Sequence, residues 1–311
     1  MGHYLVTGGA GFIGSHIVEH LIARDYRVTV LDNLVTGHKS NLAPVWDRIR
    51  FVEGSINQEK ALDEALAGID GIFHQAAIPS VPRSVKDPIE TQNAGEVGTL
   101  LLLKKAVEYG VKRVVYAGSS SVYGDTPTLP KHEDMCPSPR SPYAVSKLAG
   151  ESYMTTFARC YPIDTVTLRY FNIFGPRQDP DSPYSGVMAK FSTVMRAGQA
   201  PLIFGDGSQT RDFTFVDNAV EANLLSMFSD KPLEGEVMNI ASGQRVSLLD
   251  VINEFNHVLG TSFTPRFEPA RAGDVKDSLA DLTKAARLIG YTPKVSWQEG
   301  VLRLLDSERN G

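Results

Sequence analysis

The stretch Thr7-Gly8-Gly9-Ala10-Gly11-Phe12-Ile13-Gly14 decides the fold of this chain. It follows the apolar strand pattern Tyr4-Leu5-Val6 and opens a helical pattern that runs to about Ala23. Its glycines are spaced GxxGxxG, a variant of the GxGxxG fingerprint, in which glycines permit a tight turn, close approach to a pyrophosphate and helix–strand packing. We therefore expect a dinucleotide at the helix N-terminus. Its predicted ligands in this stretch are Gly8, Gly11, Phe12, Ile13 and Gly14.

An acidic residue stands where the second strand pattern ends. Arg27-Val28-Thr29-Val30-Leu31 leads into Asp32, which lies 18 residues beyond Gly14. A carboxylate there accepts the hydroxyls of an adenosine ribose and repels a 2′-phosphate, so the expected cofactor is NAD. NADP stays as an alternative because His38 and Lys39 lie close by in the sequence.

Strand and helix patterns continue to alternate after Asp32. Apolar strands are predicted at 49–56, 71–74, 113–117 and 165–170, with helical patterns between them. This rhythm indicates an α/β fold with a doubly wound parallel sheet, a Rossmann-type domain, over residues 1–175. Prolines and loops become frequent from Gly175-Pro176 onward, which predicts a smaller α/β substrate domain over residues 176–311. Segments near 212–242 look like strands that return to the first domain.

Composition excludes several classes of protein. The 311 residues are 42% hydrophobic, enough for a full core, and the net charge of -5 argues against nucleic acid or an anionic membrane surface as partner. No apolar run of membrane-spanning length occurs, and Met1 leads directly into a strand pattern, so we expect a cytoplasmic protein. Cys136 and Cys160 are the only cysteines, and their context predicts neither a disulfide framework nor a metal site.

A candidate catalytic pair lies in Ser141-Pro142-Tyr143-Ala144-Val145-Ser146-Lys147. Ser141 suits the N-cap and Pro142 the first position of a helix, which puts Tyr143 and Lys147 on one face, four residues apart. A phenol has a pKa near ~10, and we expect the ammonium group of Lys147 to lower that of Tyr143. Alone, the pattern is more common as a surface feature.

Several motifs together resemble the extended short-chain dehydrogenase/reductases, and in particular the UDP-hexose 4-epimerases. They follow the family order along nearly the whole chain: TGGAGFIG at 7–14, DNL at 32–34, HQAA at 74–77, SSSVYG at 119–124, the Tyr143/Lys147 pair and RYFN at 169–172. The resemblance implies an NAD-dependent enzyme in which Ser119, Tyr143 and Lys147 are catalytic. Ser120 and Ser121 stand where the related 4,6-dehydratases have Asp-Glu, so elimination of water is not expected.

The resemblance also implies the remaining binding residues. Ser55 replaces an Asp that usually bonds the adenine in the family. Beyond the glycine motif, the cofactor would contact Asp32, Asn33, Gly37, Ser55, Ile56, Ala76, Ala77, Asn93, Tyr143, Lys147 and Tyr170. Arg211 and Arg271 would bind a diphosphate, because a planar guanidinium meets phosphate oxygens in pairs. The substrate set is Ser119, Ser120, Ser121, Asn172, Val187, Lys190, Leu202, Phe204, Arg211, Arg271, Asp274 and Ser278.

The sugar is expected to be an N-acetylhexosamine. The resemblance implies that Ser278 limits the space at the sugar's C2 substituent, and a serine leaves room for an N-acetyl group. Arg177-Gln178-Asp179-Pro180 with Tyr184 also resembles the branch acting on such sugars. We therefore expect interconversion of UDP-GlcNAc and UDP-GalNAc, and of UDP-Glc and UDP-Gal as further substrates.

Other functions stay open. A UDP-glucuronate 4-epimerase would use a carboxylate partner, for which Arg177 is a candidate. Another nucleotide-sugar oxidoreductase and a non-enzymatic NAD(H) sensor are further alternatives. The resemblance implies a homodimer formed through the helices at about 95–109 and 147–160.

Overall fold

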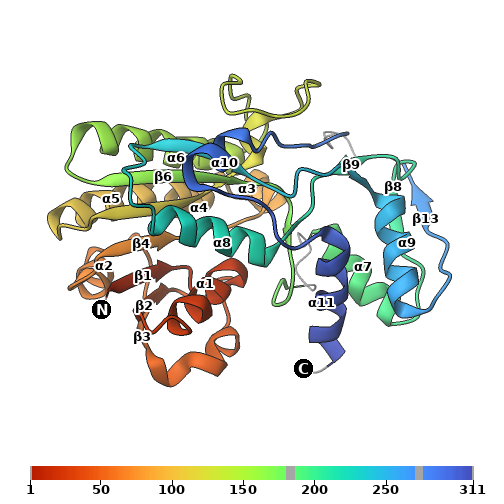
Figure 1. Cartoon of the computed structure of the whole chain (residues 1–311), viewed down its shortest axis with the longest axis horizontal. Helices are drawn as coiled ribbons and strands as arrows, with labels where there is room; N and C mark the ends of the chain where they lie inside the picture. The colour runs from red at the N-terminus through yellow and green to blue at the C-terminus, as the bar shows by residue number, and fades with distance from the viewer. Residues whose placement is uncertain (1, 180–185, 270–275, 310–311) are drawn as a thin grey trace.

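The structure is a computed structural model that describes residues 2–179, 186–269 and 276–309 (Figure 1). Its main body is a seven-stranded sheet with the order β11-β6-β5-β4-β1-β2-β3, and all neighbouring pairs are parallel. The doubly wound parallel sheet predicted from the sequence is therefore confirmed. Its strands are β1 (His3–Thr7), β2 (Arg27–Asp32), β3 (Ile49–Glu53), β4 (Gly71–His74), β5 (Arg113–Ser119), β6 (Asp164–Tyr170) and β11 (Glu236–Ile240).

Helices cover both faces of this sheet. Because successive side chains on a strand point to opposite faces, Val6 belongs to one core and Leu5 to the other. The first core includes α1 (Phe12–Ile22) and α8 (Val216–Met227). The second includes α2 (Glu59–Leu66), α5 (Gly98–Glu108) and α6 (Pro142–Cys160). Strands buried on both faces explain the nearly continuous apolar runs in the sequence.

The strand order reverses beside β1, which lies between β2 and β4. In open α/β sheets, ligands bind at the carboxyl ends of the strands next to such a reversal. Asp32, at the end of β2, and the turn after β1 both lie there. The fold thus places the glycine motif and the acidic strand end at the same edge of the sheet.

Asn93, a predicted cofactor residue, lies inside a longer helical segment. This segment begins at Pro88, where the Asp87 side chain accepts a hydrogen bond from Glu90 N, and α4 (Pro88–Gln92) runs directly into a π-helical turn (Asn93–Val97) and then α5. An Asp cap followed by Pro at the first helical position starts a helix efficiently. Asn93 therefore lies within the helix, not at its start. α3 (Val81–Lys86) precedes it.

Elements within residues 187–211, 248–268 and 297–309 form a smaller lobe at the right of Figure 1. Val237-Met238-Asn239-Ile240-Ala241 does return to the main body, because β11 pairs with β6. Thr214-Phe215-Val216-Asp217, also expected as a returning strand, pairs over only two residues and then starts α8, since Asp217 suits the first turn of a helix. The division at residue 175 stays a prediction. The other elements are η1 (Lys39–Arg48), η3 (Ser120–Tyr123), β7 (Ile173–Phe174), α7 (Val187–Arg196), β8 (Leu202–Phe204), β9 (Thr210–Arg211), β10 (Thr214–Phe215), β12 (Val246–Ser247), α9 (Leu248–Leu259), β13 (Arg266–Glu268), α10 (Thr283–Ile289) and α11 (Trp297–Arg309).

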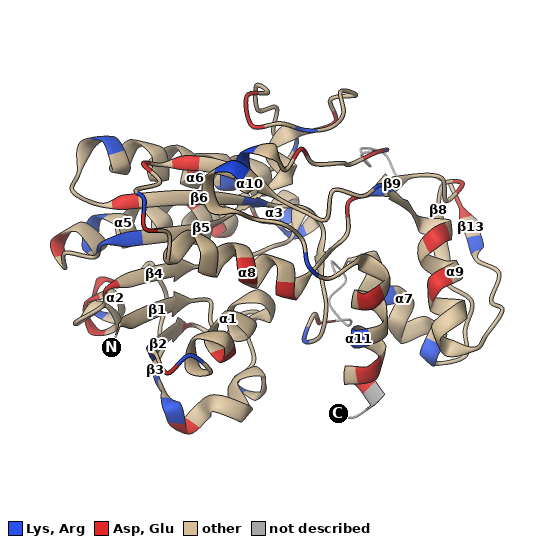
Figure 2. Ribbon diagram, viewed as in Figure 1, with Lys and Arg blue, Asp and Glu red and all other residues tan. Residues whose placement is uncertain are grey.

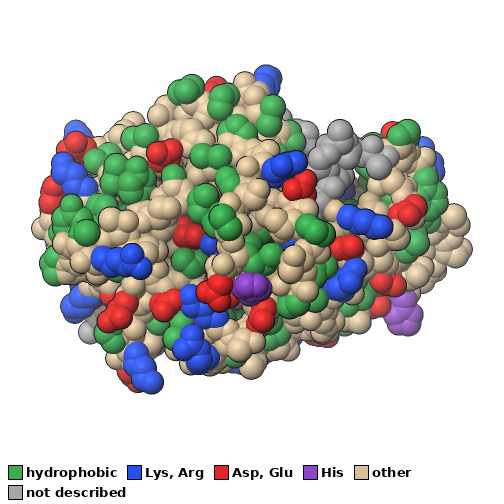
Figure 3. Space-filling model, turned by 90° about the horizontal axis from the view of Figure 1, so that it is seen from above, with side chains coloured by type: hydrophobic (Ala, Val, Ile, Leu, Met, Phe, Trp, Pro, Cys, Tyr) green, Lys and Arg blue, Asp and Glu red, His purple; other side chains and the backbone are tan. Residues whose placement is uncertain are grey.

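Acidic and basic side chains are interspersed over the helices and loops in Figure 2, and both signs occur on the face shown in Figure 3. Lys105, for example, lies within 3.4 Å of Glu59, Asp63 and Glu108. Among the described residues, no helix is both long and apolar enough to span a bilayer.

Candidate active site

A cavity of about 1290 Å³ opens at the carboxyl ends of the parallel strands. Its walls include Asp32 from β2, Ser119 from β5 and Tyr170 from β6, together with Arg211 and Ser278 from the C-terminal part of the chain. Both halves of the sequence therefore contribute to one cleft. We call it the central cleft.

The glycine motif lines one end of the central cleft. Gly8 has φ +66°, and a Cβ added to it would lie 2.7 Å from the backbone nitrogen of Ala76. A Cβ at Gly14 would collide with the backbone oxygen of Gly8. Glycine is thus required for the tight turn and for packing α1 against it. Gly11, Phe12 and Ile13 line the cleft beside the N-terminus of α1, where unbonded N–H groups suit a phosphate.

Asp32 is held in a fixed orientation beside this turn. Its Oδ2 accepts a hydrogen bond from Ala10 N at 3.0 Å and its Oδ1 one from Leu34 N at 2.8 Å. Burial raises the pKa of this carboxyl, while the two backbone hydrogen bonds oppose that effect. Asn33 lines the cleft as well. Gly37, a predicted ligand, instead packs behind Asp32, where a Cβ would lie 2.9 Å from Oδ2.

The other predicted cofactor residues also line the central cleft: Ser55, Ile56, Ala76, Ala77, Asn93, Tyr143, Lys147 and Tyr170. The Ser55 hydroxyl already accepts a hydrogen bond from Asn57 N at 3.2 Å. The Tyr170 hydroxyl accepts from Asn223 Nδ2 at 2.6 Å and lies 3.3 Å from Gln75 Oε1.

The predicted helix start at Ser141 is confirmed. The Ser141 hydroxyl accepts a hydrogen bond from Ala144 N at 3.1 Å, and Pro142 occupies the first helical position of α6. Lys147 is 3% exposed and its Nζ donates to the backbone oxygen of Ala117 at 2.7 Å. Burial lowers the pKa of Lys147 to about 7.

The environment of Tyr143 differs from the expectation. Burial raises the pKa of its phenol, and the side chain of Ser119 acts in the opposite direction. The ammonium group of Lys147 is directed to Ala117 O, and burial lowers its own pKa. The Ser119 side chain favours the ionised form of Tyr143.

Ser119 is the last residue of β5 and caps the short helix η3. Its Oγ accepts a hydrogen bond from Ser121 N at 3.2 Å and lies 2.8 Å from Ser121 Oγ. Ser119, Ser120 and Ser121 all line the central cleft with Tyr143 and Lys147. The predicted catalytic residues thus come together in one place.

The predicted substrate residues separate into two groups. Asn172, Arg211 and Ser278 line the central cleft with the three serines, whereas Val187, Lys190, Leu202 and Phe204 lie on α7 and β8 outside its lining. Leu202 and Phe204 belong to the strand that pairs with β13. Arg271 and Asp274 lie outside the described residues, as do Pro180 and Tyr184 of the motif used for the sugar.

Two buried residues were missed by the sequence analysis. Asp212 is fully buried, and its carboxylate accepts hydrogen bonds from Ser242 N at 2.9 Å and Ala280 N at 3.1 Å, so it connects three distant segments near Arg211. The Arg211-Asp212 pair was the available signal. Lys131 is 2% exposed, and its Nζ donates to Thr126 Oγ1 at 2.6 Å.

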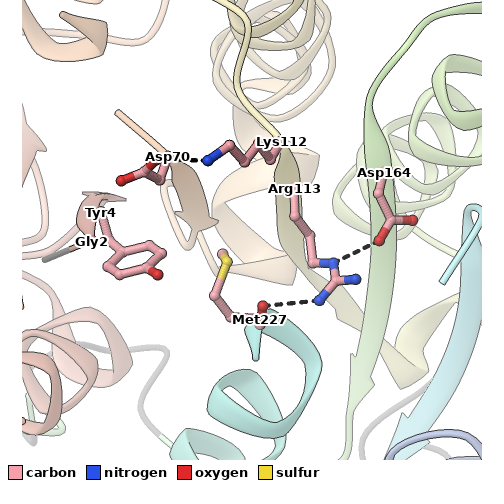
Figure 4. Close-up of a pocket in the computed structure, with 7 residues that line it drawn as sticks. All are labelled: Gly2, Tyr4, Asp70, Lys112, Arg113, Asp164 and Met227. Carbon is pink, nitrogen blue, oxygen red and sulfur yellow. Dashed lines mark hydrogen bonds and ion pairs between the residues drawn. The ribbon is translucent and has the colours of Figure 1, made fainter. Parts of the chain in front are cut away.

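A second cavity, of about 580 Å³, lies at the opposite, amino-terminal ends of the strands (Figure 4). Its wall includes Arg113, whose Nε donates to Asp164 Oδ2 at 2.6 Å and whose Nη1 donates to Met227 O at 2.9 Å. These bonds join the C-terminus of α8 to the sheet. We therefore interpret the residues around this cavity as structural.

Comparison with known proteins agrees with this geometry. The family described as "NAD dependent epimerase/dehydratase family" matches residues 4–241. The chain belongs to this family. A UDP-glucose 4-epimerase of Mycolicibacterium smegmatis is 38% identical over 315 residues, which cover 98% of each chain.

Solved structures of epimerases are similar over almost their whole length. The UDP-N-acetylglucosamine 4-epimerase of Methanobrevibacter ruminantium, in complex with UDP-N-acetylmuramic acid, has a TM-score of 0.94 and 36% identity, covering 99% of this chain and 98% of that one. The UDP-glucose 4-epimerase of Thermotoga maritima, with UDP-glucose, has a TM-score of 0.93 and 38% identity, covering 99% of each. The epimerase-family chain is therefore an isomerase.

NAD is the cofactor of this family. The residues present fit it, because the Gly8 and Gly14 positions leave no room for a Cβ and the Asp32 carboxylate lines the same end of the cleft. The NAD cofactor predicted from the sequence motif is thus confirmed.

Proposed function

We propose that this chain is an NAD-dependent UDP-sugar 4-epimerase that interconverts UDP-GlcNAc and UDP-GalNAc, and also UDP-Glc and UDP-Gal, through a 4-keto intermediate. The observation that carries the proposal is the meeting of Ser119, Tyr143 and Lys147 with Ser278 in one cleft. Ser119, Tyr143 and Lys147 would carry out the proton transfer, and Ser278 would border the space for the sugar.

Tyr143 takes the proton from the 4-hydroxyl of the sugar and later returns it. The side chain of Ser119 stabilises the ionised phenol, and the hydrogen bond from Lys147 to Ala117 O keeps the lysine beside β5. When bound, NAD supplies the acceptor for the hydride of C4 and afterwards its donor. Between these two events the 4-keto sugar rotates so that its other face meets the cofactor. This rotation requires strong binding of the nucleotide and weak binding of the hexose.

The two ends of the cleft differ as this rotation requires, with a charged group for the nucleotide and small residues for the sugar. Arg211 would bind the diphosphate, with its Nη1 oriented by hydrogen bonds to Thr210 O at 2.9 Å and Lys276 O at 3.1 Å. The sugar end carries the small serines 119–121 and Ser278. The backbone nitrogen of Ser278 donates to Thr210 O at 3.1 Å, which fixes the position of this small residue. Space at this position supports an N-acetylhexosamine.

Three alternatives are less well supported. A UDP-glucuronate 4-epimerase of Thermodesulfobacterium geofontis is 32% identical to this chain. The candidate carboxylate partner, Arg177, donates to Glu19 Oε1 at 2.5 Å and to Ser15 Oγ at 3.2 Å, so its charge is already matched on α1. A dehydratase would need acid–base groups at Ser120 and Ser121, and hydroxyls at these positions do not supply them. A sensor without catalysis would not need the Ser119–Tyr143–Lys147 set.

The test is to incubate the purified protein, without added cofactor, with UDP-GlcNAc, UDP-Glc and UDP-glucuronate in separate reactions and to detect the C4 epimer by NMR. We expect UDP-GalNAc from UDP-GlcNAc and no product with the Tyr143→Phe control. Turnover of UDP-Glc with inert UDP-GlcNAc would refute the specificity argued from Ser278. Turnover of UDP-glucuronate alone would favour the first alternative.

We also propose a cytoplasmic homodimer formed through α5 and α6. Leu100 on α5 is 37% exposed and Val145 on α6 is 44% exposed, which supports a covered apolar surface there. Sedimentation equilibrium measures this directly, and a monomer at micromolar concentration would contradict it.

A further inference from the structure

His74 is the last residue of β4, and its side chain has no access to solvent. Of the seven histidines, all of which the structure describes, it alone is buried. Its Nδ1 lies 2.7 Å from Thr7 Oγ1, and its Nε2 lies 2.9 Å from Thr99 Oγ1. Both threonines are fully buried too, so these two hydroxyls have to satisfy the ring.

The hydrogen bonds of Thr99 determine which ring nitrogen carries the proton. The Thr99 hydroxyl donates to Gly95 O at 2.6 Å, and a hydroxyl has only one proton to donate. It must therefore accept the bond from His74, so Nε2 carries a hydrogen. Burial, and to a smaller extent the charge of Lys147, lowers the pKa of His74 to about 3. The ring is therefore neutral under physiological conditions, and its Nδ1 is an acceptor.

The hydrogen bonds keep the same direction on the other side of the ring. Because Nδ1 accepts, the Thr7 hydroxyl donates to it, and Thr7 Oγ1 in turn accepts from Ala76 N at 3.3 Å. We call the resulting series of bonds the His74 network; it runs from Ala76 N through Thr7, His74 and Thr99 to Gly95 O. Only the neutral Nε2–H form of the imidazole accepts at Nδ1 and donates at Nε2, so this form alone completes the network.

Both ends of the His74 network reach the cofactor end of the central cleft. Ala76 lines this cleft, and a Cβ on Gly8 would lie 2.7 Å from Ala76 N, so the glycine turn packs against the same backbone. Gly95 belongs to the π-helical turn Asn93–Val97, and Asn93 also lines the cleft. The network therefore connects the glycine turn with the turn that carries Asn93.

We propose that His74 is a positioning residue whose Nε2–H tautomer holds the Ala76 backbone and the turn of Asn93 in the geometry that receives NAD. The inference concerns the cofactor and is independent of the sugar, so it goes beyond the proposed function. Loss of one bond leaves a buried donor and a buried acceptor unpaired, which is costly. The two segments recover partners only by leaving this geometry, so the cost falls on the form that binds NAD.

The first test determines the tautomer in the NAD-loaded protein by NMR with ¹⁵N-labelled histidine. His74 is recognised by a slowly exchanging ring N–H, because it is the buried histidine. We expect that hydrogen on Nε2, none on Nδ1, and no protonation of the ring down to about pH 5. A hydrogen on Nδ1, or a ring that becomes charged above about pH 5, would overturn the proposal.

The second test removes one hydroxyl from the network and keeps a side chain of similar size. Thr99→Val leaves His74 Nε2–H and Gly95 O without this partner. We expect bound NAD to exchange with isotope-labelled NAD about tenfold faster, the usual consequence of an unpaired buried group. Thr99→Ser keeps the hydroxyl and should restore the wild-type exchange rate. Thr167→Val is the matched control, because the Thr167 hydroxyl is buried and makes no hydrogen bond with the described residues.

The outcomes separate this inference from the proposed function. A wild-type exchange rate in Thr99→Val, or an equal acceleration in Thr167→Val, would overturn the role of the network. A serine variant that releases NAD as fast as the valine variant would also overturn it. Faster exchange in Thr99→Val of a protein that epimerises no UDP-sugar would support the inference and instead refute the proposed function.

Discussion

The ammonium group of Lys147 lies 4.9 Å from the centre of the Tyr116 ring. An aromatic face attracts a cation, but it replaces only part of the hydration that Lys147 loses on burial. Its ammonium group also donates a hydrogen bond to Ala117 O. The position of Lys147 is therefore fixed, but its charged form is destabilised relative to that of an exposed lysine.

This cost makes the stability of the protein depend on pH. Burial brings the pKa of Lys147 to about 7, far below the value of an exposed lysine. Between about pH 7 and 10 the unfolded chain binds more protons at this site than the folded chain, so the free energy of unfolding rises with pH. The expected contribution is at most about 1.4 kcal/mol per pH unit. Urea unfolding of the wild type and of Lys147→Met over this range measures it. Parallel pH profiles of the two proteins would contradict the prediction.

Removal of the Tyr143 hydroxyl should affect chemistry and not binding. We expect Tyr143→Phe to lower kcat by roughly 10²–10⁴-fold, the usual contribution of a proton-transfer group. Its NAD content after purification should equal that of the wild type, because the glycine motif and Asp32 are unchanged. Loss of NAD together with activity would show that the phenol serves binding instead.

Gly14→Ala should damage the turn between β1 and α1. The added Cβ meets the backbone oxygen of Gly8, which is not free to move because Gly8 itself packs on Ala76. We expect loss of bound NAD and a lower melting temperature. Gly110→Ala is the control, since Gly110 has a positive φ but open space around it and should cost only about 1 kcal/mol with NAD retained. Retention of NAD by Gly14→Ala would contradict the close packing.

Asp212→Asn should weaken the C-terminal part of the cleft. The amide group would present a donor to backbone N–H groups that now point at a carboxylate oxygen, Ser242 N and Ala280 N among them. We expect a loss of about 2 kcal/mol in stability and a rise in KM for the UDP-sugar, because these bonds hold segments on either side of Arg211. Asp134→Asn, at a side chain that is 98% exposed, serves as the control in the same unfolding and kinetic assays.

Arg169→Met should be costly on its own. Arg169 donates to both carboxylate oxygens of Glu151, at 2.8 Å and 2.6 Å, and both side chains are buried. Leaving the glutamate alone in the interior should cost about 3–5 kcal/mol. The double variant Arg169→Met, Glu151→Met should recover much of that loss, and chemical unfolding of the three proteins tests it. Equal stability of the single and double variants would refute the argument.

The sequence was most informative where backbone geometry allows one residue type. Gly8 and Gly14 predicted the turn because no Cβ fits there. Ser141-Pro142 predicted the start of α6 because these residues suit the N-cap and the first helical position. Strand periodicity gave the sheet, since both faces are buried.

The sequence was least informative where the contacts of a side chain depend on segments that are distant in the chain. The spacing of Tyr143 and Lys147 suggested a direct electrostatic effect, but Lys147 is directed to Ala117 O. The π-helical turn at Asn93 has no simple periodic signal. The substrate contacts expected at Val187, Lys190, Leu202 and Phe204 depend on how the small lobe packs, and these residues lie outside the lining of the cleft.

Strand β11 pairs with β6 although about 65 residues separate them in the chain, so the edge of β6 has no backbone partner while the intervening residues are being synthesised. A nascent chain that has emerged only as far as residue 175 carries the cofactor motif but an incomplete sheet. Such an intermediate exposes a template for pairing with other chains, and its completion awaits the arrival of Ile240 from the ribosome. The sheet that carries the cofactor motif is therefore complete only once β11 has been synthesised.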